Sequence, residues 1–206
     1  VGDITVSGGS LSNFNALSSL NYSATFTPSG NGATTIDVTA NKFTDAVGNN
    51  NTAASQFTWT YDAVLPTISS VSLASNNATI AVTMSEAVYR TNGGSGSLEE
   101  SDFGFTISGG SATLASATPS SISASGNVYT LGIALSGTPT GAETLTVNPT
   151  DNGIYDVAGN EASTSQSNNT ASLNDQVVPT MAITAAAGGS AVSSGATTNN
   201  STLTLT

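Results

Sequence analysis

The chain has 206 residues, of which 37% are hydrophobic and only 7% are charged, and its thirteen acidic and two basic side chains give a net charge of −11. We therefore expect no nucleic-acid partner, because phosphate contacts need a basic surface, and no membrane insertion, because no stretch is long and apolar enough to span a bilayer. The lack of His and Cys removes disulfides, thiolate metal sites and the commonest catalytic bases and nucleophilic dyads, so we expect no enzyme.

Residues 1–63 show apolar residues alternating with Thr and Ser, which is typical of half-buried strands. Asn31-Gly32 lies between two strand candidates and favours a hairpin turn. Aromatic side chains at every second position, Phe57, Trp59 and Tyr61, share one face of a strand, which we expect to lie against the domain core. The predicted strands are Asp3–Val6, Tyr22–Thr27, Thr34–Val38 and Gln56–Tyr61.

The segment Asp62–Thr67 is a predicted linker, since Pro66 lacks a backbone donor and favours a strand that begins after it. Residues 64–176 then show seven short strand patterns separated by turn residues, which predicts a complete immunoglobulin-like β-sandwich. Leu98–Asp102 is predicted as a helical turn. The predicted strands are Ile68–Leu73, Ala78–Met84, Phe103–Ile107, Ala112–Ala117, Val128–Ala134, Glu143–Val147 and Thr170–Leu173.

Two sequence patterns occur twice at a spacing of about a hundred residues, which indicates tandem domains. The loop Asp45–Asn49 recurs as Asp156–Asn160, and the linker Asp62–Thr67 recurs as Asp175–Thr180. After the second linker only Met181–Thr184 and Ser201–Thr206 have strand patterns. The predicted fold class is therefore all-β, with one complete immunoglobulin-like domain at 64–176 and two partial ones, the C-terminal part of a domain at 1–63 and the N-terminal strands of another at 177–206.

Most carboxylates have no cationic side chain to pair with, which makes divalent cations plausible ligands. If each Asp-x-x-Gly-Asn loop packs at the same pole as the outgoing linker, two trios of oxygen ligands converge, and Glu86 reaches the first junction or a loop of its own domain. The same loops are equally compatible with simple turns, because Asp often caps a tight turn and Gly tolerates positive φ. The candidate calcium ligands are Asp45, Asn49, Asp62, Glu86, Asp156, Asn160 and Asp175.

The alternation of Asp-x-x-Gly-Asn loops with Asp-x-x-x-Pro-Thr linkers resembles the bacterial immunoglobulin-like repeats of large surface adhesins and biofilm-associated proteins. Phe43–Asn49 and Tyr155–Asn160 carry the resemblance best, and Ser85–Val88 resembles a further recurrent element. The resemblance implies long extracellular stalks, often stiffened by calcium at domain junctions, at the bacterial cell surface.

Three functional hypotheses follow. The first is a structural segment of an extracellular adhesin stalk, whose partners are neighbouring immunoglobulin-like repeats and, at the cell surface, glycans or proteins. The second is a self-assembling filament of identical subunits joined head to tail, in which the tail of one chain supplies strands to the partial domain of the next. The third is a glycan-binding module, using Trp59 and Tyr61, or an accessory domain of a secreted enzyme.

Overall fold

The structure is a computed structural model that describes residues 2–197, 202, 204 and 205. Apart from one 3₁₀ turn, η1 (Glu100–Asp102), its regular elements are strands. They are β1 (Thr5–Ser7), β2 (Gly9–Ala16), β3 (Tyr22–Pro28), β4 (Gly32–Asp37), β5 (Phe57–Tyr61), β6 (Ile68–Leu73), β7 (Thr79–Met84), β8 (Phe103–Ser108), β9 (Thr113–Leu114), β10 (Ile122–Ser125), β11 (Val128–Gly132), β12 (Leu135–Ser136), β13 (Thr144–Pro149), β14 (Thr170–Ser172), β15 (Ala185–Ala187), β16 (Ser190–Val192) and β17 (Thr204–Leu205).

Strands β6–β14 form a sandwich, which we call the central sandwich. One sheet has the order β10-β11-β7-β6, the other has the order β14-β13-β8, and the short pair β12-β9 lies beside them. Alternate residues of β7 and β13 are buried, as expected of strands with one face on a core. The principal cluster of buried hydrophobic residues among those described belongs to this sandwich, and Ile80, Val82, Leu131, Leu145 and Val147 have no exposed surface.

The N-terminal sheets, built from β1–β5, repeat part of this pattern without its core. The order β1-β4-β5 matches β8-β13-β14, and the pair β2-β3 matches β10-β11. In the central sandwich β11 also pairs with β7, whereas β3 pairs with β2 alone among the described strands. Apolar side chains are consequently left uncovered, including Phe14 (42% exposed) and Phe57 (65% exposed).

Two local expectations for the N-terminal part need correction. Asn31-Gly32 does not close a hairpin, because β3 and β4 belong to different sheets and the turn crosses between them. The aromatic face of β5 is only partly covered: Trp59 packs edge-on against Phe26 with ring centroids 4.6 Å apart, but Phe57 stays exposed. A strand must meet an opposing layer to bury its face, and this sheet has little opposite it.

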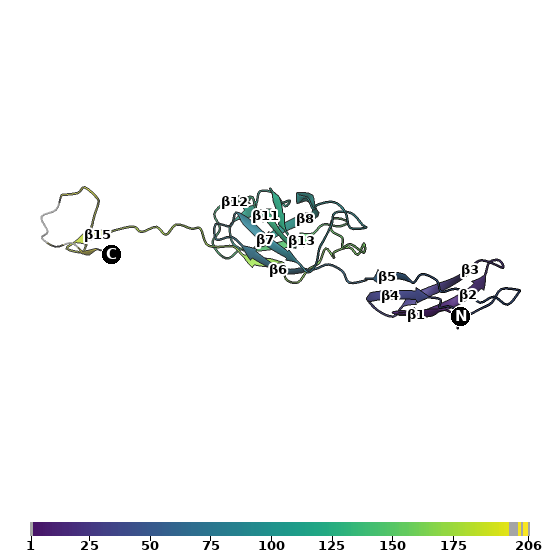
Figure 1. Cartoon of the computed structure of the whole chain (residues 1–206). Coiled ribbons are helices and arrows are strands. Elements are labelled where there is room, and N and C mark those ends of the chain that lie inside the picture. Colours follow the sequence, from purple (N-terminus) through teal and green to yellow (C-terminus); the bar gives the residue numbers. More distant parts are fainter. Residues whose placement is uncertain (1, 198–201, 203, 206) are drawn as a thin grey trace.

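The C-terminal part forms a small sheet with the order β16-β15-β17. The strand expected at Met181–Thr184 is wrong, because these residues are extended coil and the strand begins at Ala185. Of the strand expected at Ser201–Thr206, β17 covers Thr204–Leu205, while residues 201, 203 and 206 lie outside the described part. Figure 1 shows the central sandwich between the N-terminal sheets and these strands along an elongated chain.

Candidate metal site at the first linker

The loop Asp156–Asn160 of the central sandwich, which we call the acidic loop, is a tight turn closed by hydrogen bonds between its own residues. Asp156 Oδ1 accepts a hydrogen bond from the Asn160 backbone N–H at 2.8 Å, and Oδ2 accepts one from Asn160 Nδ2 at 2.8 Å. Gly159 supplies the positive φ of 93° that the turn requires. The aspartate is fully buried and held in a single orientation.

The first linker is fastened to the same end of the sandwich. The Thr67 N–H donates to Ser85 Oγ at 2.9 Å, and the Ser85 N–H donates to the Thr67 carbonyl at 2.8 Å, which ties the linker to the end of β7. Asp62 forms an Asx turn by accepting from the Val64 N–H at 2.9 Å, and Asn160 Nδ2 reaches the Asp62 backbone carbonyl at 3.2 Å. The linker therefore crosses directly over the acidic loop.

These contacts bring three carboxylates together. One oxygen each of Asp62, Glu86 and Asp156 lies within 4.8 Å of the others. The two cationic side chains of the sequence do not reach them: Arg90 forms an ion pair with Glu99 at 2.5 Å and lies 3.6 Å from Asp102, and Lys42 belongs to the N-terminal part. Three like charges at this distance repel one another by about 3 kcal/mol per pair at the dielectric constant of a protein surface.

The pKa of Glu86 reflects this environment. Burial raises it above its ordinary value, and the neighbouring charges of Asp156 and Asp62 raise it further. A divalent cation among the three carboxylates would remove this repulsion. Because all the candidate ligands are oxygen atoms and the sequence has no His or Cys, the site suits a hard cation such as Ca²⁺ or Mg²⁺.

The two predicted trios do not converge. Asp175 lies near Pro139, whose carbonyl accepts from the Gln176 N–H at 2.9 Å, and its neighbour Asn174 donates from its backbone N–H to Asn77 Oδ1 at 2.8 Å. Asn77, which bonds to the neighbour of Asp175, precedes β7. Glu86, which lies beside Asp156, follows β7. Asp175 and Asp156 therefore lie at opposite ends of a strand roughly 20 Å long.

The first trio fails for the same reason. The Asp45–Asn49 loop follows the end of β4, whereas Asp62 follows β5, which runs antiparallel with Tyr61 opposite Gly32 at the start of β4. Each loop thus faces away from the linker that leaves its own domain. Asp62 instead meets the loop of the domain that follows it.

Sequence reasoning missed two further buried carboxylates, Asp102, which lies 3.6 Å from Arg90, and Glu143. Glu143 has no exposed surface, and its oxygens accept from the backbone N–H groups of Ser111, Ala112 and Thr140 and from Thr140 Oγ1. Hydrogen bonding, chiefly from Ala112, lowers the pKa of Glu143 to about 2. The only sequence signal for it is a single Glu before the alternating segment Thr144–Pro149. We assign Glu143 a structural role, because its hydrogen bonds join the loop at Ser111 and Ala112 to the loop at Thr140.

Comparison with known families gives one match. Residues 1–61 match the family model described as a bacterial Ig-like domain. No curated protein and no solved structure matches the chain. No helix among the described residues is long and apolar enough to cross a membrane. The chain has an all-β, immunoglobulin-like fold, and its first 61 residues are similar to a bacterial Ig-like domain.

Proposed function

We propose that the chain is a structural segment of an extracellular bacterial adhesin stalk and that Ca²⁺ at the first linker holds neighbouring domains in line. The observation that carries the proposal is the cluster of Asp62, Glu86 and Asp156, which joins a linker residue to two residues of the following sandwich. A cation bound there would fix the linker to the sandwich. The match of residues 1–61 supports a structural repeat module of a class that is often surface-exposed.

The remaining candidate ligands take different places in this proposal. Asn160 orients Asp156 and holds the Asp62 carbonyl, so it is a positioning residue. Asp45 and Asn49 form the same turn without a linker above it, and Asp175 has no carboxylate trio around it among the described residues. We therefore assign one cation to the described chain.

Calorimetric titration of the EDTA-treated full chain with CaCl₂ tests the site. We expect one binding event that disappears in the variant carrying Asp62→Asn, Glu86→Gln and Asp156→Asn. The matched control, Asp45→Asn with Asp175→Asn, removes two carboxylates from the other candidates and should bind as the parent does. Equal binding by the triple variant would refute the assignment.

Limited proteolysis with proteinase K tests the stiffening. We expect Ca²⁺ to slow cleavage within residues 62–67 and to leave cleavage within residues 175–180 unchanged, so that the second linker is an internal control. If saturating Ca²⁺ left cleavage of the first linker unchanged, Ca²⁺ would bind without stiffening the linker, which would contradict the mechanical role.

A second candidate, the head-to-tail filament, is favoured by the uncovered apolar side chains of the N-terminal sheets. The tail segment Thr202–Thr206 has the same alternation as Thr79–Thr83 in β7, the strand that β11 pairs with in the central sandwich. Deleting residues 181–206 should then abolish concentration-dependent association in light scattering. Association that survives the deletion would refute strand exchange.

The glycan-binding hypothesis stays a prediction. Trp59 is half-buried against Phe26, while Phe57 and Tyr61 are more exposed. Loss of glycan-array signal on Trp59→Ala would favour it over the stalk.

A further inference from the structure

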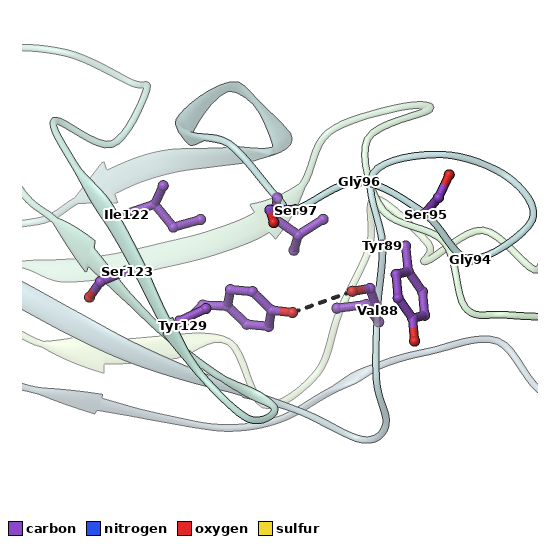
Figure 2. Close-up of a pocket in the computed structure, with 11 residues that line it drawn as sticks. Val88, Tyr89, Gly94, Ser95, Gly96, Ser97, Ile122, Ser123 and Tyr129 are labelled. Carbon is purple, nitrogen blue, oxygen red and sulfur yellow. Dashed lines mark hydrogen bonds between the residues drawn. The ribbon is translucent and has the colours of Figure 1, made fainter.

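The central sandwich has a groove of about 660 Å³ on the side away from β6. Its floor contains the buried side chains of Val88, Leu98 and Tyr129. Residues 122–124 of β10 form one wall and residues 94–97 form the other. Figure 2 shows Ile122 and Ser123 on one side of the Tyr129 ring and the segment carrying Gly94–Ser97 on the other.

The β10 wall is an open sheet edge. In the order β10-β11-β7-β6 this strand is terminal, and β11 is its pairing partner. Ser125 and Val128 close a two-residue turn, so they form a hydrogen-bonded pair. Because such pairs alternate along an antiparallel ladder, the backbone N–H and C=O groups of Ile122 and Ala124 point away from β11, at the open edge of the sheet.

A hydrogen bond at the other end of the strand supports this register. The Gly132 N–H donates to the Ser121 carbonyl at 2.9 Å, so the backbone of Ser121 also faces β11. Ser121, Ser123 and Ser125 therefore direct their backbone groups toward β11, and the residues between them direct theirs outward. Both residues with outward-directed backbone groups line the groove.

The opposite wall is preformed by main-chain contacts. The Arg90 N–H donates to the Gly96 carbonyl at 3.1 Å, and the Thr91 N–H donates to the Ser95 carbonyl at 3.0 Å. Gly94 and Gly96 have φ values of 77° and 84°. At Gly94 a Cβ would come within 2.9 Å of Val157 Cγ2, so only glycine lets this wall pack on the Asp156–Asn160 loop.

Charge restricts what the groove can hold. No charged residue is among those that line it, although the chain carries a net charge of −11. Sheet edges are commonly protected by charged residues or proline, and the segment Ile122–Ser125 has neither. The lining is complementary to an uncharged segment, and the net negative charge of the chain disfavours an acidic one.

We propose that this groove binds an extended, uncharged peptide segment, which adds as a strand to β10 and seats an apolar side chain against Leu98 and Tyr129. Strand addition uses the open backbone groups for affinity and the pocket beside them for selectivity. A neutral glycan fits less well, because Tyr129 is buried, its hydroxyl donates to the Val88 carbonyl at 3.4 Å, and the lining has no carboxylate or amide side chain.

The test is an amide-shift titration of the isotope-labelled full chain by NMR. The probe is an acetylated and amidated pentapeptide of alternating threonine and valine. We expect shifts at residues 122–125 and 94–98. The matched control is the same peptide N-methylated at alternate residues, which keeps the side chains but removes the strand-pairing donors, and it should cause no shifts there.

Two further measurements make the test decisive. Ala124→Pro removes one outward-directed donor and should weaken binding at least tenfold, with folding checked by circular dichroism. If that variant unfolds, the contrast between the two peptides still decides. Equal binding of the N-methylated peptide, shifts confined to other residues, or shifts at the groove with maltohexaose but not with the peptide would each overturn the proposal.

Discussion

The loops Asp45–Asn49 and Asp156–Asn160 have the same sequence pattern and fold into the same turn, yet one is exposed and the other is covered. Asp45 accepts from the Asn49 backbone N–H and from Asn49 Nδ2, both at 2.9 Å, just as Asp156 accepts from Asn160. These bonds, with the side-chain bond from Asn49 the strongest, lower the pKa of Asp45. Asp156 lies beneath Asp62 and beside Glu86, whereas Asp45 faces solvent.

The comparison teaches that the turn and the candidate metal site are separate properties. The local sequence determines the turn completely, because its hydrogen bonds lie within five residues. The site needs two further carboxylates from a linker and from a strand end, and only tertiary structure supplies them.

The largest expected effect separates the central sandwich from the N-terminal sheets. Leu131→Ala leaves a cavity in a fully buried position and should lower the free energy of unfolding by about 3 kcal/mol. Leu11→Ala, at a half-buried position of β2, should cost less than about 1 kcal/mol. Urea unfolding separates the two regions, because Trp59 is the only tryptophan and reports the N-terminal sheets, while circular dichroism also reports the sandwich. A shift of the tryptophan transition in Leu131→Ala would mean that both regions unfold together.

The second prediction concerns the two loops. In Ca²⁺ at a hundredfold excess over its Kd, the parent chain should gain about 2.7 kcal/mol of stability relative to EDTA, and Asp156→Asn should gain none. In EDTA, Glu86→Gln should be at least as stable as the parent, because it removes one of three repelling charges and leaves the hydrogen bonds from Asn160 to Asp156 in place. Asp45→Asn should respond to Ca²⁺ as the parent does, because Asp45 is not part of the cluster. Thermal unfolding in the two buffers measures this, and an Asp45→Asn chain that loses the response to Ca²⁺ would contradict the role given to the linker.

The smallest effect concerns Glu143, whose equivalent is missing from the N-terminal sheets. Its pKa is about 2 in the folded chain against an ordinary 4.5, so its stabilisation is complete above pH 4.5 and is lost as the pH falls toward 2. Glu143→Gln should lower the thermal midpoint of the sandwich at pH 7 by on the order of 5 °C. The difference from the parent should vanish near pH 2, and a difference that persists there would show that packing is responsible rather than charge.

Sequence periodicity was enough for most of the fold. Thr79–Met84 alternates so regularly that its strand and its buried face follow directly, and the helical turn before Phe103 is confirmed as η1. The sequence did not predict the strand β10, because Ile-Ser-Ala-Ser is short and mostly small and polar. An edge strand with little buried surface does not need an apolar alternation. The pairing of linkers with loops was wrong because it assumed that neighbours in sequence share a pole, whereas antiparallel strands carry them to opposite ends.

The position of Asp62 above the loop of the following sandwich also determines where such a chain can be divided. The linker makes hydrogen bonds to Ser85 and Asn160 of the following sandwich, against one from the Ala63 N–H to Asn31 of the N-terminal sheets, so it is fastened mainly to the domain on its C-terminal side. A transferable module therefore begins before Asp62, and a cut placed after Thr67 would leave the linker behind with the wrong domain. Anyone who shuffles, duplicates or shortens these repeats should place the boundary immediately after Tyr61.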